Sequence, residues 1–184
     1  MSSEEKIVVV DYDPTWPLTF ATLRAPISEA LAGIAVSVEH VGSTSVPGLA
    51  AKPIVDIDVV VPSRAELPAA VQKLASLGYV HRGNLGIEDR EAFERPARLP
   101  AHHLYACVQG SAALENHLAI RDHLRRNRAA ASKYGQLKKQ LAERFPTDID
   151  SYVAGKTDFL LGALDSAGFP EPVLRAIRGA NQKK

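Results

Sequence analysis

The sequence predicts an α/β (α+β) fold in which a mixed sheet with helices is followed by a helical C-terminal part. Runs of β-branched residues alternate with helical patterns as far as residue 110, and only helical patterns follow. The chain has 184 residues, 46% of them hydrophobic, which suits one domain with a helical extension. We expect an α/β core over residues 1–110 and a helical C-terminal region over residues 111–184 packed on that core.

The first elements are a short strand at residues 7–11 and a helix that ends at Gly33. Asp13 is a good N-cap for this helix, and Pro14 suits its first turn. Apolar residues recur at spacings of three and four, at Trp16, Phe20, Leu23, Ile27 and Leu31. This spacing predicts one buried helix face.

Two strands follow, at residues 34–41 and 54–61, with a loop between them. Lys52 precedes a proline, which biases it to extended geometry and leads the chain into the second strand. A helix is expected at residues 64–77, and strands at 79–82, 92–95 and 102–109. Helices are then expected at 112–127, 129–145 and 150–167, with a short helix after Pro172.

Charge and composition exclude several classes of protein. The formal net charge is +1, so no global field favours nucleic acid or an anionic membrane, and we expect neither as a partner. The single cysteine, Cys107, cannot form an internal disulfide. The start, MSSEEKIVVV, lacks an apolar segment of signal-peptide length, and no apolar stretch approaches the ~20 residues that cross a bilayer. We expect a cytoplasmic protein and leave its oligomeric state open.

Asp56 and Asp58 are the first candidates for chemistry. They lie two apart in an expected strand, so both side chains share one face, while Val55, Ile57 and Val59 share the other. Neighbouring carboxylates repel each other unless a cation compensates, and Mg²⁺ takes one or two carboxylates and completes its shell with water and phosphates. A lone Asp-x-Asp is better explained by a solvated face at a sheet edge.

Gly42 and Ser43, with Thr44, form a second candidate at the end of the preceding strand. Glycine lets the backbone approach a ligand, and exposed N–H groups with a hydroxyl can hold a phosphate. An ordinary turn is the plain alternative. Together, however, the Gly-Ser turn and the Asp-x-Asp strand predict a phosphate cradle beside a metal site.

The segment EHVGSTSVPGLAAKPIVDID, residues 39–58, resembles the signature of the GrpB family, which belongs to the DNA-polymerase-beta-type nucleotidyltransferase superfamily. That superfamily has Gly followed by Gly or Ser, then two acidic residues one apart on a strand, then a third on a later strand. The resemblance continues through HHLYAC, HLAIRDHLRRN, YGQLKKQLA and YVAGKTDFL, and so covers nearly the whole chain. It implies a nucleotidyltransferase-like fold and an Mg²⁺ or Mn²⁺ cofactor held by Asp56 and Asp58.

The chain departs from the superfamily pattern at the third acid. The strand at residues 102–109 has no acidic residue; His102 and His103 stand there instead. A neutral imidazole can ligate a metal, so His103 is a candidate ligand or phosphate contact. The alternative for the histidine pair is one core residue and one surface residue.

Basic residues supply the remaining candidates. Lys52 enters the Asp-x-Asp strand directly, and Arg121 begins a basic stripe at helical spacing, although a solvated helix face explains such a stripe equally well. Lys156 shares a helix face with Tyr152, where a lysine needs a partner or an exit to water. The resemblance adds weight to Lys156, because lysines of the C-terminal helices contact the triphosphate in several nucleotidyltransferases.

Two functions follow from these residues and from the resemblance. The first is Mg²⁺-dependent nucleotide binding with nucleotidyl transfer to an unknown acceptor. In this hypothesis Asp56, Asp58 and Lys52 are catalytic, and the ligand is a nucleoside triphosphate or a related phosphate-bearing small molecule. The second is a non-catalytic nucleotide- or coenzyme-binding module, because similar domains are fused to dephospho-coenzyme A kinase and because the third acid is missing.

Overall fold

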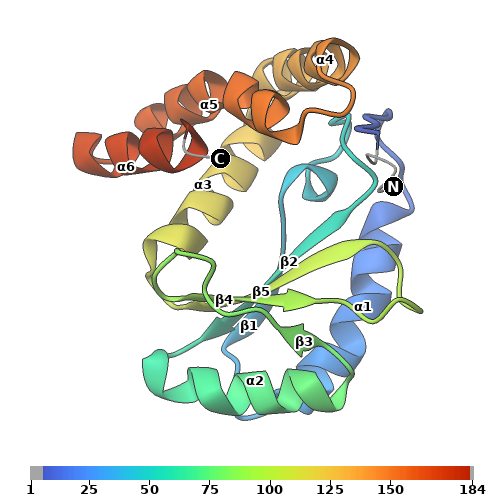
Figure 1. Cartoon of the computed structure of the whole chain (residues 1–184), viewed down its shortest axis with the longest axis vertical. Coiled ribbons are helices and arrows are strands. Elements are labelled where there is room, and N and C mark those ends of the chain that lie inside the picture. The colour runs from blue at the N-terminus through green and yellow to red at the C-terminus, as the bar shows by residue number, and fades with distance from the viewer. Residues whose placement is uncertain (1–5, 183–184) are drawn as a thin grey trace. The chain divides into compact units, whose positions relative to one another are not determined.

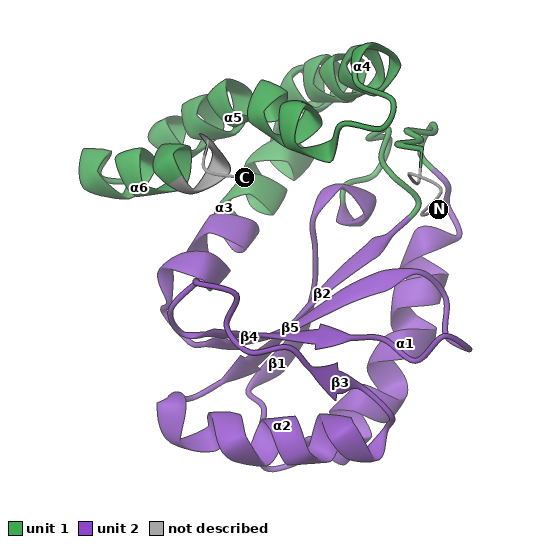
Figure 2. Ribbon diagram, in the orientation of Figure 1, with its two compact units in different colours: residues 1–12, 46–53, 119–184 green, residues 13–45, 54–118 purple. Residues whose placement is uncertain are grey.

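The computed structural model describes residues 6–182, and the chain divides into two compact units (Figures 1 and 2). Residues 13–45 and 54–118 form one, called here the sheet unit. Residues 1–12, 46–53 and 119–184 form the other, the helical unit. The acidic start of the chain, residues 1–5, lies outside the described residues. The expected boundary at residue 110 stays a prediction.

The sheet unit contains a mixed five-stranded sheet in the order β1-β2-β5-β4-β3. The strands are β1 (Ser37–Val41), β2 (Val55–Val61), β3 (Val80–His81), β4 (Arg90–Glu94) and β5 (His102–Val108). Strands β2 and β5 are parallel, whereas the other neighbours are antiparallel. This arrangement confirms the mixed sheet expected from the sequence and puts β2 and β5, the strands with candidate site residues, side by side.

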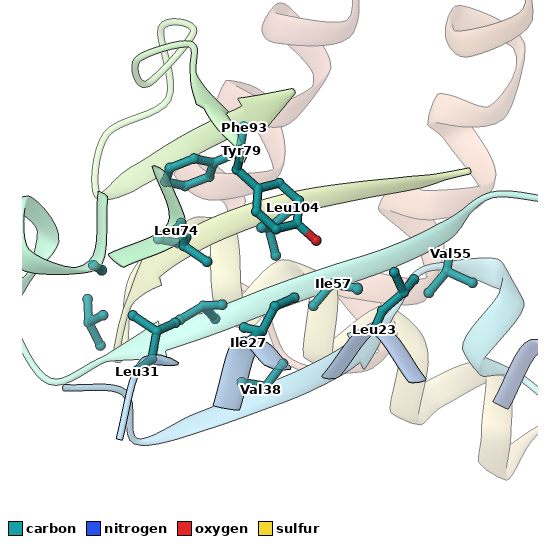
Figure 3. Packing of buried hydrophobic residues seen from close by; sticks show 14 residues of the cluster. Leu23, Ile27, Leu31, Val38, Val55, Ile57, Leu74, Tyr79, Phe93 and Leu104 are labelled. Carbon is teal, nitrogen blue, oxygen red and sulfur yellow. The ribbon is translucent and has the colours of Figure 1, made fainter. Parts of the chain in front are cut away.

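One face of this sheet, the apolar face, packs on helices α1 (Trp16–Ala30) and α2 (Leu67–Ser76). Figure 3 shows Leu23 and Ile27 of α1 close to Ile57 of β2 and Leu104 of β5, and all four are buried in one cluster. Burial of the apolar side chains of this cluster is the main stabilisation of the sheet unit. The buried helix face predicted from the spacing of apolar residues is therefore confirmed.

The opposite face of the sheet, the polar face, carries Asp56 and Asp58 of β2 and His103 and Tyr105 of β5. Its far end is covered by the first turns of α3 (Ala112–Arg126), where Leu114 packs with Val60 and Cys107. The polar face therefore packs against apolar side chains of α3 at the end with Val60 and Cys107, and it carries ionisable side chains at the end with Asp56 and His103.

The helical unit contains the rest of α3 and three further helices, α4 (Arg128–Arg144), α5 (Ile149–Ser166) and α6 (Glu171–Gln182). Asn127 caps α4 by accepting a bond from the Ala130 N–H, and Asp148 caps α5 by accepting from Ser151. Gly155 is required where α5 meets α4, because a Cβ there would run into Leu141. No helix in the described part of the chain is both long and apolar enough to cross a bilayer.

Four expected elements differ from the structure. Helix α1 begins at Trp16 with Thr15 as its N-cap, so Asp13 lies before the cap and accepts a hydrogen bond from the Thr15 N–H. Residues 7–11 form no strand, because only Val10 makes a bridge, to Ala51. The strand expected at 79–82 is reduced to Val80–His81, and the short helix expected after Pro172 is the 12-residue helix α6, which begins at Glu171 and includes Pro172. A pattern of apolar residues does not show whether a segment lies beside a strand with which it can pair. Within the described residues, the N-terminal segment pairs only through the bridge between Val10 and Ala51.

Candidate functional site

The turn after β1 is shaped by Gly42 and brings the backbone against Asp56. Gly42 has a φ of 69°, in the left-handed region that favours glycine, and a Cβ at this position would run into the Asp56 carboxylate. Val41 and Asp56 are paired in the antiparallel ladder, which fixes this close approach. Glycine is therefore needed here for its conformation and for its lack of a side chain.

A one-turn 3₁₀ helix, η1 (Ser43–Ser45), follows Gly42 and is held from within. The Ser45 hydroxyl donates to the Gly42 carbonyl oxygen at 2.6 Å, and the Thr44 hydroxyl shares a 3.0 Å hydrogen bond with His40 Nε2. Thr44 and Ser45 are buried, whereas Ser43 is partly exposed. Of the expected phosphate contacts, Gly42 and Ser43 lie at the surface of the turn, and Thr44 faces inward as a support.

Asp56 and Asp58 lie on the polar face of β2 but differ in exposure. The Asp56 side chain is 30% exposed and that of Asp58 is 0% exposed. Glu39 of β1 is paired in register with Asp58 and so shares its face, which adds a third acidic side chain to this region.

Each aspartate is paired with a histidine. His103 Nδ1 donates to Asp56 Oδ1 at 2.8 Å across the β2–β5 ladder, and His117 Nδ1 of α3 donates to Asp58 Oδ2 at 2.7 Å. Burial by itself lowers the pKa of His117, but the bond to Asp58 and the charges of Asp58 and Asp56 outweigh it and raise this pKa above its ordinary value. The repulsion expected between the carboxylates is therefore offset by donors from two elements.

His102 and His103 are neighbours with opposite roles. His102 lies on the apolar face, where its Nδ1 donates to the Pro100 carbonyl oxygen and its Nε2 accepts from the Tyr79 hydroxyl, both at 2.8 Å. Burial lowers the pKa of His102. His103, in contrast, is 50% exposed beside Asp56. The pair thus has one satisfied core residue and one residue at the candidate site.

Tyr105 links the two histidines, and Arg90 of β4 covers it. The Tyr105 ring lies 6.4 Å from the His103 ring and 6.2 Å from the His117 ring, and the Arg90 guanidinium carbon is 4.5 Å from the Tyr105 ring centroid. Burial raises the pKa of Tyr105, as does the charge of Asp56, while Arg90 opposes this shift. Tyr105 is therefore a neutral side chain next to both His103 and His117.

Two carboxylate oxygens remain for a ligand. In the described part of the chain Asp58 Oδ1 is buried and has no hydrogen-bond partner, and the Asp56 side chain has no hydrogen bond besides the one from His103. Within residues 6–182 no group of three or more His, Cys, Asp or Glu side chains is arranged to hold a metal ion. Two carboxylate oxygens without further protein ligands fit Mg²⁺, which keeps waters and takes phosphate oxygens, better than they fit Zn²⁺.

The expected basic residues belong to the helical unit. Lys156 Nζ lies 4.5 Å from the Tyr152 ring centroid, which confirms their shared helix face, and Arg121 Nε donates to Asp122 Oδ1 at 2.8 Å. Lys52 is partly exposed. Contact of these three residues with a phosphate stays a prediction.

His117 and Glu39 are the site residues that the sequence reasoning missed. His117 stands one helical turn after Leu114 and next to Leu118, two residues of the apolar cluster beneath α3, so the only available signal was a histidine within an apolar helix face. Glu39 could have been found from the register alone, because a five-residue strand antiparallel to β2 places it opposite Asp58.

Comparison with known proteins places this chain in a family. The family model described as GrpB protein matches residues 6–166. UPF0157 protein SCO7215 of Streptomyces coelicolor is 38% identical over 165 residues, which cover 89% of this chain and 85% of that protein. UPF0157 protein YqkA of Bacillus subtilis is 32% identical over 89% of this chain, which spans only 48% of YqkA. The crystal structure of GrpB from Enterococcus faecalis superposes with a TM-score of 0.77 at 33% identity, over 88% of this chain and all of that one.

More distant matches extend the comparison. The Cid1 poly(U) polymerase bound to Mg 3′-dATP matches with a TM-score of 0.52 at 13% identity, over 83% of this chain and 49% of that one, a likeness of fold alone. A dephospho-CoA kinase of Mycolicibacterium paratuberculosis is 29% identical over 173 residues, 80% of this chain and 42% of that protein. The chain belongs to the GrpB family and has a nucleotidyltransferase-like fold.

Proposed function

We propose that the polar face of the sheet binds a nucleoside triphosphate with a divalent metal and transfers its nucleoside monophosphate to an acceptor. One observation carries the proposal: the glycine turn after β1 lies directly against the carboxylate of Asp56, which shares a face of β2 with Asp58, and within residues 6–182 each carboxylate keeps one oxygen without a hydrogen-bond partner. A phosphate cradle beside two oxygens suited to Mg²⁺ is the arrangement that nucleotide chemistry needs.

In this proposal the role of each residue follows from its position. Asp56 and Asp58 would hold Mg²⁺ or Mn²⁺, which when bound neutralises phosphate charge. Gly42 gives a phosphate access to backbone N–H groups, and the Ser43 hydroxyl donates to a phosphate oxygen. Lys52, Arg121 and Lys156 would neutralise the remaining charge, which is most of what phosphoryl-type transfer asks of a protein.

The reaction is a substitution at the α-phosphorus. An acceptor oxygen forms a bond to that phosphorus, the bond to the bridging oxygen of the β-phosphate breaks, and pyrophosphate leaves. A hydroxyl acceptor loses its proton to bulk water. Asp56, Asp58 and the turn keep the phosphate chain fixed during the exchange, so their contribution is position and charge.

The comparisons support this proposal at the level of fold. The polymerase that shares the fold is described with a bound magnesium nucleotide, and at 13% identity this likeness supports the fold alone. The chain itself spans about half of that protein and of YqkA. The acceptor is therefore a matter for experiment.

A second function is a non-catalytic module that binds a nucleotide or coenzyme for a partner enzyme. The similarity to part of a dephospho-CoA kinase favours it, as does the lack of an acid on β5. Both functions need the same phosphate site, and they differ in turnover.

A thermal-shift screen of nucleotides and coenzyme A precursors, with and without Mg²⁺ or Mn²⁺, tests the shared site. A ligand at ~100 times its Kd should stabilise the protein by about 2.7 kcal/mol, and release of pyrophosphate from a hit would select the transferase over the module. A matched variant, Asp56→Asn, keeps the shape and the hydrogen bond to His103 but removes the charge. If no nucleotide or coenzyme with either metal stabilises the wild type, the site does not bind phosphates.

A further inference from the structure

The two Asp–His pairs share one geometry although they come from different elements. His103 lies on β5 and His117 on α3, yet each donates from Nδ1 to one oxygen of its aspartate, at 2.8 and 2.7 Å. Ring position is thus fixed through the same nitrogen in both histidines. Because one oxygen of each carboxylate is engaged within the described residues, the other is left for a ligand.

The surroundings of the two unengaged oxygens differ. Asp58 Oδ1 belongs to a side chain with 0% exposure and has no partner in the described residues, and a buried polar atom without a partner is costly. The Asp56 carboxylate lies against Gly42, where a Cβ would overlap Oδ2. The Asp58 carboxylate is therefore confined by burial, and the Asp56 carboxylate occupies the space that the lack of a side chain at Gly42 leaves open.

We propose that His103 and His117 are positioning residues that aim the two carboxylates at one divalent cation and do not ligate it themselves. The inference rests on the proposed function, because it concerns the same site. Hydrogen bonds from an outer shell fix the orientation of carboxylate ligands and contribute strongly to metal affinity. The inference also explains why two histidines lie at the site although no group of three or more ligating side chains occurs within residues 6–182.

His103 allows a test that separates positioning from ligation. An asparagine amide nitrogen occupies nearly the place of Nδ1 and can donate to Asp56, whereas a glutamine amide reaches nearly the place of Nε2. A positioning role through Nδ1 therefore predicts that His103→Asn retains metal affinity and that His103→Gln loses it. Ligation through Nε2 predicts the reverse. Because His103 is half exposed, both variants should fold.

The experiment is a Mn²⁺ titration of the full chain followed by electron paramagnetic resonance, with melting temperatures measured without metal. His103→Gln should bind Mn²⁺ about 10-fold more weakly than wild type, and His103→Asn within about 3-fold of it. His81→Gln is the matched control. The partner of His81 is Glu91, at 2.6 Å between Nε2 and Oε2, and not an aspartate of the site. This control should leave Mn²⁺ affinity unchanged.

Each other outcome is decisive. Retained affinity in His103→Gln with loss in His103→Asn would make His103 a ligand and overturn the inference. Equal affinity in both variants, whether wild-type or weakened, would also overturn it, because the Nδ1 donor would then not be the deciding atom. A wild type that binds no Mn²⁺, alone or with a nucleoside triphosphate, would instead overturn the proposed function.

Discussion

The two faces of strands β2 and β5 use the same backbone for opposite purposes. On the apolar face Ile57 and Leu104 are buried against helices α1 and α2. On the polar face Asp56 and His103, one residue away along each strand, form a hydrogen-bonded pair. Because side chains alternate along a strand, the packing that fixes one face also fixes the positions of the groups on the other.

The adjacent histidines of β5 show the same division within a single dipeptide. His102 has both ring nitrogens satisfied inside the core, and His103 faces the aspartates with one nitrogen engaged. The polar face is thus the less satisfied of the two, as Asp58 Oδ1 also shows, since it is buried and has no hydrogen-bond partner within residues 6–182. The variants below test this contrast between the two faces.

The largest effect is expected on the apolar face. Ile57→Ala should lower the free energy of unfolding by about 4 kcal/mol, because Ile57 is fully buried and its loss leaves a cavity. Urea denaturation measures this change. If the two faces are separable, the folded variant should keep wild-type Mn²⁺ affinity, and a parallel loss of affinity would break the comparison.

His117→Leu is expected to affect both stability and binding. It leaves the Asp58 charge buried without its donor, which should cost about 3 kcal/mol at neutral pH, the low end for a buried pair because His117 is 28% exposed. The matched variant His81→Leu removes the more exposed pair with Glu91 and should cost under ~1 kcal/mol. Equal losses in the two variants would show that burial of Asp58 contributes nothing.

Tyr79→Phe should have the smallest effect of the three. It removes the hydroxyl that donates to His102 Nε2 and leaves a buried acceptor unsatisfied, at a cost of about 1–2 kcal/mol. Affinity for Mn²⁺ should not change, because this bond lies on the apolar face. Unaltered stability in urea denaturation would show that His102 finds another donor.

Much of the fold could be predicted from the sequence because its signals are local. The alternation in β2 separated Val55, Ile57 and Val59 from the two aspartates, and the three-and-four spacing in α1 identified its buried face. The Gly42 turn could also be predicted, since only glycine suits both its φ and its lack of space.

The histidine partners of the aspartates could not be predicted, because they depend on contacts distant in the chain. Asp58 and His117 are 59 residues apart, and Asp56 and His103 are 47 apart. Sequence spacing shows which side chains share a face, but strand order and the path of α3 decide what lies across from them. For the same reason the sequence predicted the repulsion between Asp56 and Asp58 but not the histidine donors that offset it.

The most direct test of the central claim is calorimetric titration of wild type and Asp56→Asn with a nucleoside triphosphate, in Mn²⁺ and then in EDTA. The claim is that the polar face binds phosphate through a metal held by its aspartates. It predicts wild-type binding in Mn²⁺, none in EDTA, and a loss of at least ~10-fold in Asp56→Asn despite an unchanged melting temperature without ligand. Binding that is equally tight in EDTA and in the variant would contradict it.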